Sequence, residues 1–178
     1  MRVVVVEAPA PVVTWEMAEQ HLKLDGDDTQ KDYVEGLIAT ATGLLDGPEG
    51  WLGRAIGMQT LEAYLPMPLR CAVVQLPYRP IVDLLAVETQ ASAGWEAMEP
   101  AAYSLSGIAV SFRYRSTTLT AAAPEGLRIR YRAGYNDVPA PIRTAILMMT
   151  SELYRNRGSG EASFAAAKML LSSFEVYR

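Results

Sequence analysis

The order of sequence patterns along this 178-residue chain constrains its fold more than any single motif. Two short amphipathic segments come first, strand-like segments follow, and a further helical segment opens at Pro139-Ala140-Pro141. The sequence ends on an aromatic and basic stretch, Phe174 to Arg178. This order predicts an α+β fold: a small bundle of about four helices, with an antiparallel β subdomain inserted between the second and third helices.

Both N-terminal helical segments are amphipathic. In the first, Trp15, Ala18 and Leu22 fall on one helix face. Thr14 precedes them as a candidate N-cap, whose hydroxyl we expect to accept from the amides of the first turn. The second segment repeats apolar residues at helical spacing until Asp46-Gly47-Pro48 ends it.

Four residues near the N-terminus are candidates for packing between subunits. Gly36 and Gly43 lie inside the second helical segment, where each costs up to ~1 kcal/mol relative to alanine. Close approach of another helix or chain would explain them, and simple tolerance of glycine explains them equally well. Val3 to Val6 form an extended apolar segment that pairs with a sheet edge or with a neighbouring subunit, which makes Val4 and Val6 further candidates.

The middle of the chain has the composition of short β-strands. β-branched and aromatic residues gather in five segments, residues 59–64, 73–76, 81–88, 106–114 and 127–132. Prolines and glycines separate these segments, and no link is long enough for the crossover helix that parallel pairing needs. The spacing therefore predicts a small antiparallel sheet.

Two helices are expected after this region. Pro141 suits the first position of the third helix, whose buried stripe is predicted to contain Ile142, Ile146, Met149 and Leu153. Residues 158–160 break it, and a last helix spans about residues 161–171. The expected organisation is an N-terminal part of residues 1–56, an inserted β subdomain of residues 57–135 and a C-terminal part of residues 136–178, together forming one compact unit.

Composition and charge limit the classes of function. Half of the residues are hydrophobic and a fifth are charged, as in ordinary folded proteins. The net charge of −4 gives no broad basic field for gripping a DNA backbone. Arg128, Arg130 and Arg132 alternate on one predicted strand face, where solvation or a subunit contact is favoured over a nucleic-acid patch. A single cysteine, Cys71, excludes an internal disulfide and suits a reducing compartment.

The sequence contains no recognisable catalytic or metal centre. His21 and Cys71 are the whole inventory of soft metal ligands, and no nucleophile elbow accompanies the histidine. The glycines of residues 47–53 lack the lysine of a phosphate-binding loop. We therefore predict a protein that is not an enzyme and needs no cofactor.

Several stretches together resemble the head–tail connector (adaptor) family of tailed bacteriophages, prophages and gene transfer agents. They occur in the expected order and span almost the whole chain: residues 13–24, residues 53–60, Leu76-Pro77-Tyr78-Arg79-Pro80-Ile81, residues 129–142 and the terminal residues 174–178. Each stretch alone is weak, and their order is more specific than any one of them.

This resemblance implies a structural role in the virion, at the interface of head and tail, after assembly in the host cytoplasm. Such proteins form a homo-oligomeric ring, typically a dodecamer, beneath the portal protein, and receive the tail or a stopper on the other face. Carried onto this sequence, the resemblance assigns portal binding to Phe174, Val176, Tyr177 and Arg178; the alternative is a tail that packs on its own domain. DNA is then only passing cargo, and the acidic balance of the chain predicts a lumen along which it slides without sticking.

Three other interpretations stay open at this point, and the weakest is an enzyme, because it would rest only on carboxylates that no pattern assigns to a pair. A stopper or tail-completion protein of the same particle is a rival within the structural class. Alternatively, the β subdomain is a ligand-binding module, with Trp51, Tyr64, Trp95 and Tyr103 as candidate stacking aromatics. At least two of them exposed beside a pocket would favour that module.

Overall fold

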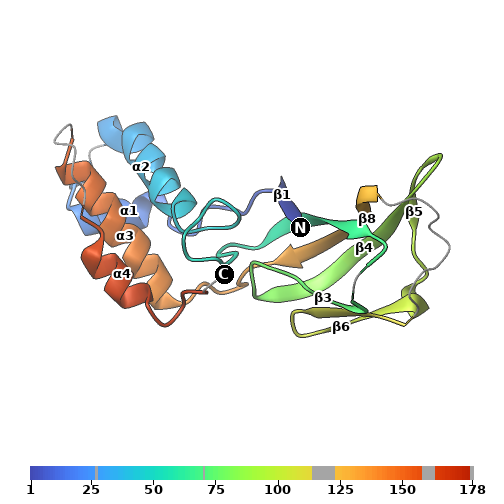
Figure 1. The fold of residues 1–178 in the computed structure, drawn as a ribbon. Coiled ribbons are helices and arrows are strands. Elements are labelled where there is room, and N and C mark those ends of the chain that lie inside the picture. The colour runs from blue at the N-terminus through green and yellow to red at the C-terminus, as the bar shows by residue number, and fades with distance from the viewer. Residues whose placement is uncertain (27, 70, 114–122, 158–162, 177–178) are drawn as a thin grey trace. The chain divides into compact units, whose positions relative to one another are not determined.

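The computed structural model describes residues 1–26, 28–69, 71–113, 123–157 and 163–176. The chain forms two compact units, each assembled from two separate stretches of sequence (Figure 1). A β unit contains residues 1–9 and 58–134, and a helical unit contains residues 10–57 and 135–178.

The larger sheet of the β unit has five strands in the order β1-β2-β8-β4-β5. Their bounds are β1 (Arg2–Glu7), β2 (Gln59–Met67), β8 (Ala123–Ala133), β4 (Ile81–Ala91) and β5 (Gly94–Ala97). All neighbouring strands are antiparallel. Because side chains alternate across a strand, Leu61 and Ala63 of β2 lie on the same face as Ile129 and Tyr131 of β8, and all four are fully buried.

A smaller three-stranded sheet completes this unit. It has the order β3-β7-β6, from β3 (Val73–Gln75), β7 (Ala109–Phe112) and β6 (Tyr103–Ser106), and a 3₁₀ turn, Pro100–Ala102, leads into β6. Val74, Val110 and Phe112 are its buried residues. The Tyr131 hydroxyl donates to the carbonyl of Pro77, 3.2 Å away, and burial raises the pKa of this phenol above its ordinary value.

The helical unit contains four α-helices in the part of the chain that the structure describes (Figure 1). They are α1 (Trp15–Leu22), α2 (Lys31–Gly43), α3 (Ala140–Arg155) and α4 (Ala165–Leu171), and a 3₁₀ turn, Asp28–Gln30, precedes α2. Their apolar stripes meet in one core, which includes Val34, Ile38, Ile142, Ile146 and Met149. Three of the four residues predicted for the stripe of the third helix are fully buried, and Leu153 is half-buried.

The predicted α+β class, the four helices and the antiparallel pairing are confirmed. The strictly inserted β subdomain is wrong in one respect, because β1 precedes all the helices and still belongs to the larger sheet. Its valines pair with β2 in a register that sets Val3 opposite Ala63 and Val5 opposite Leu61. Sheet-edge pairing is thus the alternative that the structure shows for this segment.

The expected single sheet is two sheets, and two strands were missed. The segment predicted as one strand over residues 106–114 is a hairpin, because Gly107, at φ +60°, turns the chain between β6 and β7. Gly94, at φ +132°, begins β5 in the same way after β4. Residue 114, residues 158–160 and the first two residues of the predicted last helix lie outside the described residues.

The N-cap prediction for α1 is right in position and wrong in chemistry. Thr14 is the N-cap residue in extended conformation, but its side chain makes no hydrogen bond to the helix amides. The Thr14 hydroxyl instead hydrogen-bonds the carboxylate of Glu16, and this bond is the main cause that lowers the pKa of Glu16.

Candidate functional site

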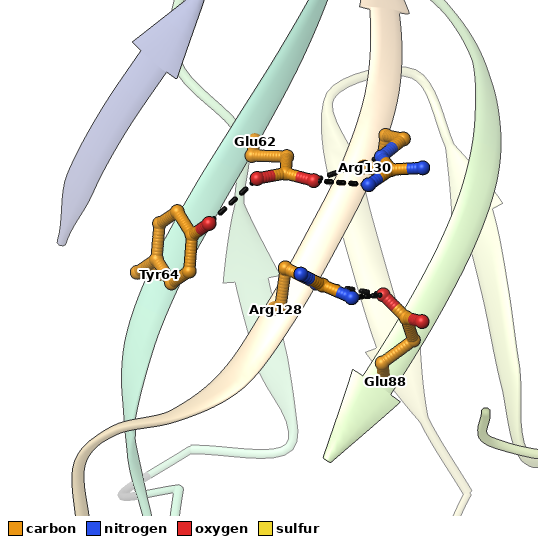
Figure 2. A network of polar contacts seen from close by, with 5 residues as sticks. All are labelled: Glu62, Tyr64, Glu88, Arg128 and Arg130. Carbon is orange, nitrogen blue, oxygen red and sulfur yellow. Dashed lines mark hydrogen bonds and ion pairs between the residues drawn. The ribbon is translucent and has the colours of Figure 1, made fainter. Parts of the chain in front are cut away.

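A network of polar side chains covers one face of the five-stranded sheet, hereafter the polar face. Arg130 donates from Nε and Nη2 to Oε1 of Glu62, at 2.8 and 2.5 Å (Figure 2). The Tyr64 hydroxyl donates to Oε2 of the same carboxylate at 2.6 Å. The Glu62 side chain is only 7% exposed, so these bonds replace most of its hydration.

The protonation of Glu62 follows from this environment. Burial alone would raise the pKa of its carboxyl, but the hydrogen bonds from Tyr64 and Arg130 outweigh burial and hold the pKa below its ordinary value. The same contact works in reverse on Tyr64, whose pKa rises because its hydroxyl bonds to a carboxylate. Glu62 is therefore an ionised structural acceptor rather than a proton donor at neutral pH.

All three arginines of β8 lie on this face and each holds a carboxylate. Besides the Arg130–Glu62 pair, Arg128 contacts Glu88 at 2.6 Å and Arg132 contacts Asp83 at 2.5 Å. The predicted alternation on one face is confirmed, since residues 128, 130 and 132 pair across to β2 and β4. Because every one of these cations is already neutralised, the row offers a nucleic acid little uncompensated positive charge.

Two of the four candidate stacking aromatics meet on the polar face. The Tyr64 and Trp95 rings are 6.1 Å apart in edge-to-face geometry. Arg2 and Arg128 cover their rings, at 4.2 Å from the Tyr64 centroid and 4.6 Å from the Trp95 centroid. Arginine side chains therefore already use these ring faces.

The other two aromatics lie elsewhere. Tyr103 begins β6, and Trp51 is in the helical unit, where Lys168 lies 5.9 Å from its ring centroid. An open hollow that the structure shows is also in the helical unit, lined by Glu19, Gln20, Lys23 and Asp25. The described chain thus offers Tyr64 and Trp95 as a pair in the β unit, and neither lines this hollow.

The candidate packing residues near the N-terminus all reach the surface at least in part. Val4 is half-buried in β1, and Val6 is exposed. Gly36 and Gly43 are exposed on α2, and a methyl group added at either would meet nothing within 4 Å. Nothing in the isolated chain therefore requires glycine at these two positions through close packing.

The C-terminal segment is anchored on its own unit. Phe174 is half-buried against the helical core, and the guanidinium Nε of Arg54 donates to its carbonyl. Arg54 also donates to the Tyr135 hydroxyl at 3.2 Å, and the Val176 amide donates to the Leu52 carbonyl at 3.2 Å. The root of the segment is thus held through Val176, whereas Tyr177 and Arg178 lie outside the described residues.

Sequence reasoning missed the roles of Glu62 and Arg54. Glu62 stands in an apolar strand opposite an arginine strand, and that juxtaposition is the signal for a buried ion pair. Arg54 follows Gly53, at φ +69°, in a turn that brings its guanidinium to a segment 120 residues later in the chain. No local sequence pattern encodes a contact of that range.

The described residues contain neither a cluster suited to a metal ion nor a helix suited to crossing a bilayer. They hold no group of three or more His, Cys, Asp or Glu side chains placed to bind a metal ion. Their helices include none with the length and apolar character that crossing a bilayer demands.

Comparisons with solved structures identify the fold. The chain aligns over 100% of its length with 97% of a chain in the neck of an empty gene transfer agent (GTA) particle with C6 symmetry, at TM-score 0.74 and 18% identity. A chain from the virion of a native GTA particle gives TM-score 0.72, and one from a native GTA neck with C12 symmetry gives 0.68, each with the same identity and coverage. No protein-family model and no curated protein sequence matches the chain.

Proposed function

We propose that this chain is a structural component of the neck of a gene transfer agent or tailed phage particle, where it acts as the head–tail adaptor. The observation that carries this proposal is the similarity of fold over the full length of the chain to chains from GTA necks. The similarity covers the β unit and the helical unit alike, so it does not rest on one common motif. The resemblance of ordered sequence stretches points to the same class.

In this role the chain forms a homo-oligomeric ring, with twelve copies as the expected number, beneath the portal protein. The C12 and C6 symmetries of the similar necks support a ring. Its other face receives the tail or a stopper protein, and its lumen passes DNA without binding a particular sequence. The chemistry of such a role is contact between surfaces, without turnover or cofactor.

The C-terminal segment is the proposed portal contact. Its root is fixed to the helical unit through Arg54, Leu52 and the half-buried ring of Phe174. A segment fixed at its root loses less conformational entropy on binding than a free one. We assign Phe174 to holding the segment and residues 176–178 to touching the portal by strand addition or groove insertion.

Electron microscopy of the chain mixed with its cognate portal tests this function. We expect rings stacked on the portal with the full chain, and none with a chain that ends at Glu175. The variant Phe174→Ala separates anchoring from contact, because it keeps residues 176–178 and removes only the ring that packs on the core. A folded full-length chain that ignores the portal would contradict the proposal, and rings found only on a tail or stopper would favour a stopper role.

A further inference from the structure

We propose that copies of this chain join edge to edge through their five-stranded sheets: the outer edge of β1 in one copy pairs antiparallel with the outer edge of Ile81–Ala86 in β4 of the next copy. The inference rests on the proposed ring and specifies how its subunits meet. It concerns only the β unit, so it needs no assumption about the helical unit.

The sheet has an open edge on both sides. β1 is the terminal strand on one side and pairs only with β2. On the other side, β5 pairs with β4 only from Glu88 to Ala91. In the part of the chain that the structure describes, Ile81–Ala86 therefore has β8 on one side and no strand on the other. Each open stretch is six residues long, and the register of the sheet sets Val4–Glu7 of β1 level with Asp83–Ala86 of β4.

Both open edges carry exposed apolar side chains at bulges. Val6 has no partner in β2, and Val82 and Leu85 have none in β8, because the register shifts at these three residues. Their exposures are 51%, 42% and 48%, and Val5 beside them is 44% exposed. Edges that stay free are usually blunted by lysine, proline, inward charges or bulges. These two edges carry bulges, but the bulged residues are exposed valine and leucine, which suits a covered surface.

Strand polarity allows the two edges to pair without any rearrangement. Along the row β1-β2-β8-β4, every neighbour is antiparallel, so β1 and β4 run in opposite directions. A second copy placed beside the first in the same orientation sets its β1 antiparallel to β4. The sheet then continues from one copy to the next with its alternation of strand direction intact.

The charges at the junction are compatible with this register. The register of the sheet sets Val4 level with Ala86 and Val5 level with Leu84, so the contact along the open stretch is apolar. Arg2 comes level with Glu88, where β5 already pairs with β4, and therefore lies beyond the open stretch. At the other end Glu7 comes level with Asp83, whose charge Arg132 already balances. Like charges directly opposite destabilise strand pairing, and here the one like-charged approach is compensated.

This contact is heterologous, since it joins two different surfaces of the same chain. A heterologous contact repeats from copy to copy until rotation closes it into a ring. A twofold dimer through two β1 edges would instead stop at two copies. The proposal therefore predicts a specific behaviour in mixtures of blocked subunits.

Disulfide trapping tests whether the two edges meet. In a Cys71→Ser background, we combine Val5→Cys with Leu85→Cys, because Val5 lies level with Leu84 and the adjacent bulge. Oxidation, with and without the portal, is expected to give a ladder of covalent oligomers. The matched control pairs Val5→Cys with Val73→Cys, an equally exposed valine on the smaller sheet, and is expected to give no ladder. The proposal is overturned if neither pair gives covalent oligomers, or if only the control pair does.

Blocked subunits test the head-to-tail order. Val6→Lys charges the β1 edge and Leu85→Lys charges the β4 edge, so neither variant alone is expected to form rings, while both keep the melting temperature of the unmodified chain. Mixed in equal amounts, they retain one compatible junction and should give dimers and nothing larger. Rings from either variant alone would overturn edge pairing. If rings form on the portal but no disulfide-linked oligomers appear, edge pairing is wrong and the adaptor function still holds. If disulfide-linked oligomers appear but the chain does not bind the portal, edge pairing is supported and the adaptor function is contradicted.

Discussion

At the scale of single residues, Glu62 is the polar group on which the β unit depends most. It is nearly buried and accepts hydrogen bonds from Arg130 and Tyr64. Glu62→Gln removes the charge while keeping the shape, and leaves Arg130 without its counterion. Since Arg130 is 38% exposed and water screens part of the loss, we expect the free energy of unfolding to fall by about 1–2 kcal/mol. Urea unfolding followed by circular dichroism measures this.

Glu125→Gln is the matched control for that substitution. Glu125 also pairs with an arginine, Arg2, at 2.6 Å, but both side chains are largely exposed. Exposed pairs contribute little to stability, so we expect no measurable change. Equal losses for the two variants would show that burial of Glu62 does not set its importance.

The same carboxylates make the β unit sensitive to acid. Hydrogen bonds hold the pKa values of Glu62 and Asp83 below their ordinary values in the folded chain. A depressed pKa adds stability above the unfolded pKa, about 4, and this stability is lost as pH falls through the folded value. We expect unfolding temperatures to drop steadily below about pH 4, and less steeply in Glu62→Gln. An acid profile that the substitution leaves unchanged would contradict this assignment.

Residue-level prediction from sequence succeeded where periodicity decided the outcome. The alternation of Arg128, Arg130 and Arg132 was enough to place them on one face. Their partners depend on the registers of β2 and β4 against β8, which bulges shift at three places. No sequence pattern predicts where these bulges occur, so the ion pairs could not be predicted from the sequence.

At the scale of elements, α2 offers a test of why it contains two glycines. Gly36 and Gly43 face open space in the isolated chain. Gly36→Ala and Gly43→Ala should therefore each raise the free energy of unfolding, by up to about 1 kcal/mol, because alanine favours the helix. Thermal melts of the isolated chain measure this, and a loss of stability would contradict the open environment.

Assembly provides the second readout for α2. If another copy packs on these glycines, Gly36→Leu will weaken ring formation on the portal, whereas Glu35→Leu on a neighbouring exposed position will not. If both variants assemble equally well, α2 is not part of the subunit interface, and its glycines are simply tolerated.

The C-terminal segment depends on an element far from it in sequence. Arg54→Ala removes the donor to the Phe174 carbonyl and to the Tyr135 hydroxyl. We expect the amides of residues 174–176 to exchange hydrogen markedly faster, with a loss of about 1–2 kcal/mol in local protection. Arg143→Ala is the control, since Arg143 pairs only at 3.4 Å with the exposed Asp137. Unchanged exchange in Arg54→Ala would show that Phe174 packing alone holds the segment.

Element boundaries were predictable where breakers mark them and missed where a turn lies inside an apolar run. Pro139 to Pro141 located the start of α3 within a residue. Gly107 divides residues 103–112 into a hairpin, although its neighbours read as one continuous strand. The Val3–Val6 segment was recognised as extended, but pairing with residues some 60 positions later is a tertiary choice that local pattern does not contain.

At the scale of the whole molecule, each unit is built from two stretches that lie far apart in the chain. The order of helices and strands could be predicted, because it follows from local periodicity. The assignment of residues 1–9 to the β unit could not, because it depends on which sheet edge is open. The same open edges are what a ring of copies would use, so the least predictable part of the fold is also the part on which assembly is proposed to depend.

The balance of charge over the whole chain predicts how an assembled ring treats DNA. The net charge is −4, and the three arginines of β8 each face a carboxylate. Because the net charge repels phosphates and the β8 arginines are already neutralised, the ring should release few counterions on contact with a duplex and bind it weakly. We expect no retention of duplex DNA in filter binding at physiological salt. Asp83→Asn combined with Glu88→Gln frees Arg132 and Arg128, and should produce binding that weakens steeply as salt rises. Salt-dependent binding by the unmodified ring would show that other, unpaired cations line the lumen, and would contradict a passage that DNA crosses without sticking.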